Sequence, residues 1–316
     1  MAPEAAAPDY RKYLDPRVLS RISGLEVRAR LIVEGFFSGR HRSPYRGLSI
    51  EFADHRAYTQ GDDIRHIDWK VYGRTDKYYI KEYEQETNLN MVLVVDRSES
   101  MSYRSTPHIL TKYEYAASLA AAMAYLTLQQ QDSVGLALFD EDIRQFLRPA
   151  NNAHHWRAII QGLDGGTGQS KTSLDRVLGE LVERLTQRTL IVLISDLFDD
   201  AYVVLRGFQH IRFRHHELIV WNLWDPAELS FPFTGPTLFD GLEASGRVHV
   251  EPRSVATRYR EEVERFRTRL RAGCGRMQAE FTSFNTSAPL DIALSGYLAT
   301  RSARLRQRSA RVMGRG

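Results

Sequence analysis

The sequence contains a single cysteine, Cys274, among its 316 residues. One thiol cannot form an internal disulfide, and it gives no support to a zinc site built on cysteines. This usage is typical of proteins in a reducing compartment. With 43% hydrophobic and 26% charged residues, the composition is that of an ordinary globular chain. We therefore expect a cytoplasmic protein that is stabilised by its hydrophobic core.

Long hydrophobic runs are absent as well. No stretch reaches the roughly 18 apolar residues that span a bilayer. Residues 1–10 have neither the basic start nor the apolar core of a signal peptide. The longest candidate, residues 115–128, is rich in alanine and contains Ser118 and Thr127, which indicates a buried helix. We expect no membrane partner.

The chain also lacks a strong net charge, which is +4 at neutral pH. The basic excess gathers at the C-terminus, where residues 301–316 hold six arginines and no acidic residue. Such a tail can bind nucleic acid or an acidic partner, but a solvated helix end and a frayed terminus are the favoured account. Residues 258–271 mix arginine with glutamate on a predicted helix, which favours a salt-bridged solvent face. A basic nucleic-acid-binding protein stays open as an alternative, but nucleic acid is not the partner that we expect.

After residue 90, short apolar segments alternate with helical patterns. The expected strands are residues 91–95, 133–139, 190–194 and 217–222, and the expected helices are 112–130, 153–163, 173–186, 199–211 and 255–272. Continuous apolar strands between helices are typical of a parallel sheet that helices cover on both faces. We therefore predict an α/β fold with a doubly wound, mainly parallel, Rossmann-type sheet. The hairpin pattern at residues 139–143 predicts one antiparallel edge strand.

The N-terminal part has a different pattern, with a helical period from Val18 to Phe37 and strand-like alternation at 49–52 and 79–83. Between these strands we expect a short helix, within residues 61–75, that buries Trp69. The expected division is a flexible leader (1–14), a small N-terminal helical and β subdomain (15–90), the main α/β domain (91–300) and a basic tail (301–316). Proline and glycine in residues 225–251 predict an irregular excursion from the sheet, with a hairpin at 237–251.

The most informative motif follows the first strand of the main domain. The apolar run ends on Asp96, and Ser98 and Ser100 follow at alternate positions. Ligands of open α/β sheets bind outside the carboxyl ends of the strands, where these three side chains converge. Mg²⁺ takes oxygen ligands of this kind in octahedral geometry. The motif therefore predicts a metal site.

Two further residues belong at the same edge of the sheet. Thr172 lies at a helix start after a glycine-rich loop, and Asp196 directly follows an apolar strand. Five oxygen ligands or near-ligands can then surround one Mg²⁺ (or Mn²⁺ or Ca²⁺): Asp96, Ser98, Ser100, Thr172 and Asp196. Hydroxyl groups are neutral, weak ligands, so a cation with only two carboxylates nearby stays under-neutralised. We expect its sixth position to accept a carboxylate from a protein partner.

The order Asp-x-Ser-x-Ser, then Thr, then Asp resembles the metal-ion-dependent adhesion site of von Willebrand factor A-like domains. The stretch RSPYRGLSIEFADHRAYTQGDDIRHIDWKVYGRTDKYYIKEYEQETN, followed by DRSESM, is similar to the bacterial family catalogued as domain of unknown function 58. This resemblance runs from about Gly39 to Asp196. It implies a von Willebrand A-like fold with an additional β segment, the same five metal ligands, and association with a MoxR-type AAA+ ATPase. The sequence departs from the wider A-domain pattern at Leu197, where a glycine often stands, which leaves the geometry of this loop open.

A nucleotide-binding enzyme is one competing interpretation. Residues 165–173, GGTGQSKTS, imitate a phosphate-binding loop, with Asp196 as a second metal-binding acid. However, Ser170 replaces the glycine whose backbone freedom such a loop needs, and a helix rather than a strand is expected before it.

A metal-dependent hydrolase is the other enzyme class. It needs a water-activating base or a second metal near Asp96. The candidates are Asp140, Asp142, Asp199 and Asp200. Acids that follow strands are commonly turn or cap residues. Our prediction is a metal-dependent protein-interaction module that is not an enzyme.

Overall fold

The computed structural model describes residues 25–38, 55–58, 69–81, 89–168, 170–241 and 246–298. The chain forms two compact units, of which one is residues 42–88 and the other combines residues 1–41 with 89–316. The predicted leader (1–14), the strand at 49–52 and the basic tail (301–316) lie outside the described residues.

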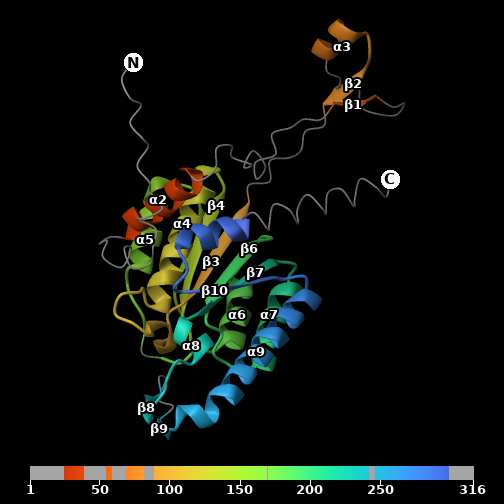
Figure 1. Ribbon diagram of the computed structural model, residues 1–316. Coiled ribbons are helices and arrows are strands. Elements are labelled where there is room, and N and C mark those ends of the chain that lie inside the picture. The colour runs from red at the N-terminus through yellow and green to blue at the C-terminus, as the bar shows by residue number, and fades with distance from the viewer. Residues whose placement is uncertain are drawn as a thin grey trace, which may run out of the picture. The chain divides into compact units, whose positions relative to one another are not determined.

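A six-stranded sheet forms the centre of the larger unit (Figure 1). Its strands are β3 (Asn90–Asp96), β4 (Ser133–Phe139), β5 (Ile143–Ala150), β6 (Leu190–Ser195), β7 (Glu217–Trp224) and β10 (Glu280–Asn285). Their spatial order is β10-β7-β6-β3-β4-β5, and every neighbouring pair is parallel except the antiparallel β4–β5 pair. The structure confirms the predicted sheet and its antiparallel edge.

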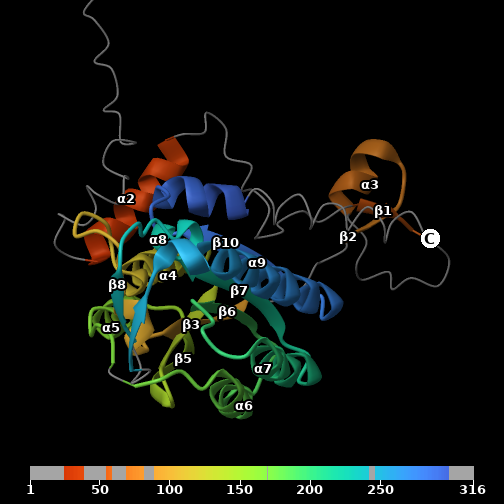
Figure 2. The same ribbon diagram turned by 60° about the horizontal axis from the view of Figure 1, so that its bottom comes forward.

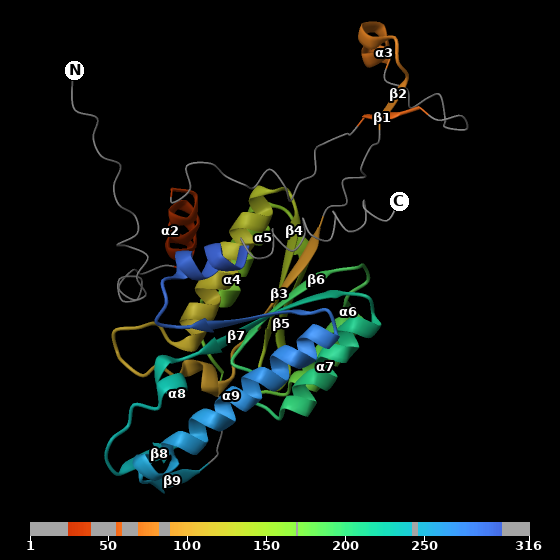
Figure 3. The ribbon, with the colours of Figure 1, turned by 45° about the vertical axis from the view of Figure 1, so that its right-hand side comes forward.

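Helices cover both faces of this sheet (Figures 2 and 3). One face carries α2 (Leu25–Ser38), α4 (Lys112–Gln129), α5 (Ala153–Leu163) and the helical residues 290–298. The other face carries α6 (Leu174–Arg184), α7 (Ala201–Phe213) and α9 (Pro252–Arg276). Because both faces are covered, β3 and β6 are buried along almost their whole length, which explains their uninterrupted apolar sequences.

Helix α4 contains the longest apolar segment that the sequence offered. It begins with a capping box between Thr111 and Glu114, and most of its residues are buried. Thus the prediction of a buried helix is confirmed. In the described part of the chain, no helix combines the length and the hydropathy that a bilayer crossing requires.

Helix α2 does not belong to a separate N-terminal subdomain, as was expected for residues 15–90. The helix packs on α4 and α5 of the larger unit, and Trp156 Nε1 donates a hydrogen bond of 3.4 Å to Glu26 Oε1. Its apolar side chains at Leu25, Ala29 and Ile32 are buried there. Periodicity predicted the helix, but it could not show which surface the apolar face would cover.

The described part of the smaller unit contains the antiparallel pair β1 (His55–Ala57) and β2 (Tyr79–Lys81), together with α3 (Trp69–Thr75). Trp69 is 61% exposed, so the prediction that its helix buries this residue was wrong. The Trp69 ring contacts Tyr72 within α3, with the ring centroids 6.1 Å apart, and most of its surface stays accessible.

The predicted excursion is present between β7 and β10. It comprises α8 (Pro226–Ser230), the antiparallel hairpin β8 (Thr237–Asp240) and β9 (Arg247–Val250), and the N-terminal half of α9. In Figures 1 and 3 the hairpin extends beyond the end of the sheet at which β3 and β7 finish. This places additional surface next to the carboxyl ends of the strands.

Candidate functional site

The five predicted ligands lie at the point where the order of the strands reverses. From β3 the chain passes through α4, on one face, to β4, and it reaches β6 through α6, on the other face. The carboxyl ends of β3 and β6 therefore flank the point where the strand order reverses, which is where ligands of such sheets bind. Asp96 ends β3 and Asp196 follows β6, and both side chains are buried.

Four of the predicted residues are in contact around the Asp96 carboxylate. The Ser98 backbone N–H donates to Asp96 Oδ1 at 2.9 Å, and Thr172 Oγ1 lies 3.3 Å from Asp96 Oδ2. The hydroxyls of Ser98 and Ser100 lie 3.1 Å apart. Three hydroxyl groups and one carboxylate thus gather in one buried corner, as predicted for these positions.

Sequence reasoning missed Ser195. This last residue of β6 donates a hydrogen bond of 2.6 Å from its hydroxyl to Asp96 Oδ2. It also accepts one of 2.9 Å from the backbone N–H of Leu197. The signal was present, because Ser195 is the polar residue between an apolar strand and Asp196, but its side chain had no assigned role.

The Asp196 carboxylate is oriented toward a buried lysine. Lys112 Nζ donates to Asp196 Oδ2 at 2.6 Å and to Glu228 Oε1 at 2.7 Å, and its side chain is only 1% exposed. The ammonium also lies 4.8 Å from the centroid of the Phe198 ring. Burial alone would lower the pKa of Lys112, but Asp196 and Glu228 outweigh it and raise that pKa above its usual value. Lys112 is therefore charged, and it neutralises part of the site.

Neither Lys112 nor Glu228 could be recognised from the sequence. Lys112 looks like an ordinary residue at a helix start, and Glu228 belongs to the irregular excursion. Residues on α4 and α8 meet only because both elements lie over the carboxyl end of the sheet.

The charge of Asp96 has no comparable partner. In the described part of the chain its hydrogen-bond donors are the hydroxyls of Ser195, Thr172 and Ser98 and the backbone N–H of Ser98, all of them neutral. Burial, together with the nearby Asp196 carboxylate, raises the pKa of Asp96 to about 7, although the hydrogen bonds from Ser195 and Ser98 oppose this. The corner around Asp96 thus favours an added positive charge.

Leu197 has the backbone conformation that usually favours glycine. Its φ is 59°, in the left-handed region, and its side chain is fully buried in the core between the sheet and α6 and α7. An L-residue in this region costs about 1–2 kcal/mol, and burial of a leucine side chain offsets a cost of that size. The departure at Leu197 therefore leaves the turn geometry intact.

The four acids considered for a hydrolase have other contacts. Asp140 and Asp142 form ion pairs of 2.7 Å with Arg144 and Arg176, and Asp200 caps α7 by accepting from the N–H of Tyr202. Asp199 Oδ1 accepts from the backbone N–H of Asp200. These are contacts of turn and cap residues. The glycine-rich segment follows helix α5, as expected, whereas a phosphate-binding loop follows a strand.

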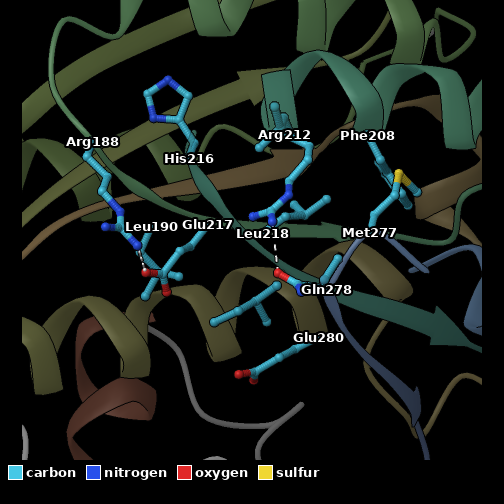
Figure 4. A pocket seen from close by; sticks show the side chains of 13 residues that line it. Arg188, Leu190, Phe208, Arg212, His216, Glu217, Leu218, Met277, Gln278 and Glu280 are labelled. Atoms are coloured by element: carbon cyan, nitrogen blue, oxygen red, sulfur yellow. Dashed lines mark hydrogen bonds and ion pairs between the residues drawn. The ribbon is translucent and has the colours of Figure 1, made fainter. Parts of the chain in front are cut away.

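A cavity of about 140 Å³ lies at the opposite end of the sheet, beside the first residues of β6 and β7 (Figure 4). Arg188 forms an ion pair of 2.8 Å with Glu217, and Arg212 donates a hydrogen bond of 2.8 Å to the neutral Gln278. It shares no residue with the Asp96 corner. Among the described residues, no group of three or more His, Cys, Asp or Glu could hold a metal ion, so a cation would depend on hydroxyl oxygens as well.

Comparison with known proteins gives one family match. The model of the family described as "Protein of unknown function DUF58" matches residues 54–271, which is more than half of the chain. The uncharacterized protein Rv1480 of Mycobacterium tuberculosis is 24% identical over 234 residues, covering 73% of this chain and 72% of the relative. The uncharacterized protein Mb1516 of Mycobacterium bovis gives the same values.

Solved structures with a similar arrangement have low sequence identity. The conserved hypothetical protein BatB from Bacteroides thetaiotaomicron has a TM-score of 0.46 and 13% identity, covering 68% of this chain and 99% of that chain. An aerotolerance-related membrane protein from Bacteroides fragilis has a TM-score of 0.43 and 12% identity, covering 65% and 96%. The SpRpn10 VWA domain has a TM-score of 0.39 and 10% identity, covering 66% and 94%.

Proposed function

The chain belongs to the DUF58 family, and from this premise we propose that it is a metal-dependent protein-interaction module. Its binding surface is the carboxyl end of β3 and β6, which we call the Asp96 site (Asp96, Ser98, Ser100, Thr172 and Asp196). The observation that carries the proposal is the buried Asp96 carboxylate. It stands among four hydroxyl groups, those of Ser98, Ser100, Thr172 and Ser195, and its donors in the described residues are all neutral.

The donor set fits a hard divalent cation, because every side chain of the Asp96 site offers oxygen. Asp96, Ser98, Ser100 and Thr172 would hold Mg²⁺ (or Mn²⁺ or Ca²⁺), and Asp196 would act from a greater distance, since Lys112 binds its carboxylate. A bound divalent cation supplies Lewis acidity toward an incoming oxygen ligand. Only one of the four close donors carries charge, so the site favours a carboxylate from the partner.

The partner that we propose is a MoxR-type AAA+ ATPase or a client that it remodels. Support comes from the likeness of residues 39–196 to the DUF58 family. An adaptor role without catalysis is part of the proposal. It is supported by the contacts of Asp140, Asp142 and Asp200, which engage in ion pairs and a helix cap.

The test uses the purified chain and a purified MoxR-type ATPase in a pull-down with Mg²⁺ or with EDTA. We expect association of the wild type in Mg²⁺ only, and none for the Asp96→Ala/Ser98→Ala double variant. Ser102→Ala is the matched control, because Ser102 lies in the same loop but is exposed and hydrogen-bonds Glu99. If the double variant binds as well as the wild type, or if EDTA has no effect, the metal-bridge proposal fails.

A calorimetric titration with Mg²⁺ and Mn²⁺ tests the site without any partner. Wild type and Ser102→Ala should bind one equivalent, and the double variant none. Thermal unfolding of all three proteins checks that the fold is retained.

A further inference from the structure

A cavity of about 950 Å³ opens directly beside the Asp96 site. Ser100 of that site and its neighbour Lys112 contribute to one wall. The remaining walls come from the excursion, namely α8, the β8–β9 hairpin and the N-terminal half of α9, together with Phe198. A cavity of this volume is in the range of roughly 300–1,000 Å³ that ligand pockets occupy. We call it the aromatic cavity.

Its walls are mainly apolar. Phe231, Phe233 and Phe239 pack against one another with ring centroids 5.0–5.7 Å apart, and Tyr259 of α9 lies 4.6 Å from Phe231. The three phenylalanine rings are only partly buried, and Phe198 at the side of the Asp96 site is 44% exposed. Phe231 has a left-handed backbone, with φ of 50°, where it caps α8. A strained residue held in this way turns the chain sharply between α8 and the hairpin.

One arginine at the rim of the aromatic cavity is available to an acidic occupant. Glu228 is paired with Lys112, and Glu262 is paired with Arg265 at 2.7 Å. Arg258 at the rim is exposed and has no ion-pair partner among the described residues. Lys112 is shared with Asp196 and Arg265 with Glu261, so the cavity carries no net positive charge. What the rim offers an acidic occupant is the local guanidinium of Arg258, on the same side as a site that is suited to a carboxylate.

We propose that the aromatic cavity binds a large apolar side chain of the same partner segment that supplies the carboxylate. The recognised element is then an acidic peptide in which phenylalanine, tryptophan or leucine flanks a glutamate or aspartate. Neighbouring residues of an extended peptide are about 3.3–3.6 Å apart along the chain. A side chain one or two positions from the carboxylate thus reaches a cavity that shares Ser100 with the Asp96 site. This inference rests on the proposed function and specifies its partner.

The test is a peptide array with the pattern X-Glu-X, embedded in a Gly-Ser sequence. Each X position is varied in turn through all natural residues. The array is probed with the full chain in Mg²⁺ and in EDTA. We expect Mg²⁺-dependent binding that is about tenfold tighter when one X is phenylalanine, tryptophan or leucine than when both are alanine, as expected for partial burial of one such side chain. The corresponding X-Gln-X peptides should not bind.

Val255→Trp, on the α9 wall, should place an indole ring in part of the cavity and lower the affinity for apolar-flanked peptides toward that for alanine-flanked ones. Mg²⁺ binding and alanine-flanked binding should stay unchanged. Val248→Trp is the matched control, because Val248 is 54% exposed and outside the cavity. Phe233→Ala, which removes part of the wall, serves the same purpose if Val255→Trp does not fold. Glutamate peptides that bind without apolar preference, or a preference that survives both cavity variants, would overturn the inference while leaving the proposed function intact.

A second measurement separates the two failures. If glutamate and glutamine peptides behave alike in Mg²⁺, carboxylate recognition at the Asp96 site fails. The cavity is then tested alone with the apolar anion 8-anilinonaphthalene-1-sulfonate in EDTA. Fluorescence enhancement by the wild type and Val248→Trp, but not by Val255→Trp, supports an apolar anion site, whereas equal enhancement by all three refutes it.

Discussion

Replacing Lys112 by methionine tests the electrostatics of the site. Methionine keeps much of the apolar stem but removes the ammonium group that binds Asp196 at 2.6 Å and Glu228 at 2.7 Å. These carboxylates are 0% and 13% exposed, and the Asp96 carboxylate is nearby. Breaking a buried ion pair by removing one partner costs about 3–5 kcal/mol. We therefore expect metal-free Lys112→Met to lose about 4 kcal/mol of unfolding free energy.

The assay is urea denaturation at pH 7.5 in EDTA, followed by far-ultraviolet circular dichroism and tryptophan fluorescence. Arg188→Met is the control, because Arg188 and Glu217 also form a 2.8 Å pair but are 74% and 48% exposed. An exposed pair contributes roughly 0–1 kcal/mol. Adding Glu228→Gln to Lys112→Met should restore part of the stability, since one of the uncompensated carboxylates is removed. A loss for Lys112→Met no larger than that for Arg188→Met would refute the reasoning.

Three further predictions concern single positions. Leu197→Gly should be at least as stable as Leu197→Ala in urea denaturation, because glycine relieves a left-handed φ that costs other residues about 1 kcal/mol. A higher free energy of unfolding for Leu197→Ala than for Leu197→Gly would contradict this. Burial lowers the pKa of His216, with Arg214 and His215 adding to the effect, and its Nδ1 accepts from the backbone N–H of Thr189 at 3.2 Å. The unfolded chain then binds the extra proton, so the free energy of unfolding should fall as the pH drops through about 6.5. The loss of unfolding free energy between pH 7.5 and pH 5.5 should be smaller for His216→Asn than for the wild type. In Gly168→Ala the new Cβ would lie 2.9 Å from Asp140 Oδ2, displacing the loop that leads to Thr172, so calorimetry should show weakened Mg²⁺ binding; Gly275→Ala, with open space at its Cβ, is the control and should leave binding unchanged.

Much of the fold could be predicted because its signals are local. The apolar run before Asp96 and the run before Asp196 are too continuous for half-exposed strands, and this alone indicates a covered parallel sheet. Parallel strands in such a sheet present their carboxyl ends at one edge. The neighbourhood of Asp96, Ser98, Ser100 and Thr172 followed from that rule, and the structure brings these four together.

Contacts that depend on packing direction could not be predicted. The apolar face of α2 carries no mark of whether it covers the N-terminal β segment or α4, and the structure places it on α4. Trp69 was expected inside because tryptophan is large and apolar, yet it is 61% exposed. In both cases the outcome depends on which surfaces are already covered, and a single sequence does not contain that information.

The sequence by itself determined the sheet, the edge at which ligands gather, and the oxygen-rich chemistry of that edge, because hydrophobic periodicity and strand direction are properties of short segments. Only the tertiary structure decided how the charges there are balanced. Lys112 and Glu228 are 116 residues apart in the chain, and they meet beside Asp196 because α4 begins and α8 lies at the carboxyl ends of the same strands. That meeting neutralises Asp196 and leaves Asp96 without a charged partner in the described residues, since charge pairing in a buried site depends on distances in space rather than on spacing along the chain.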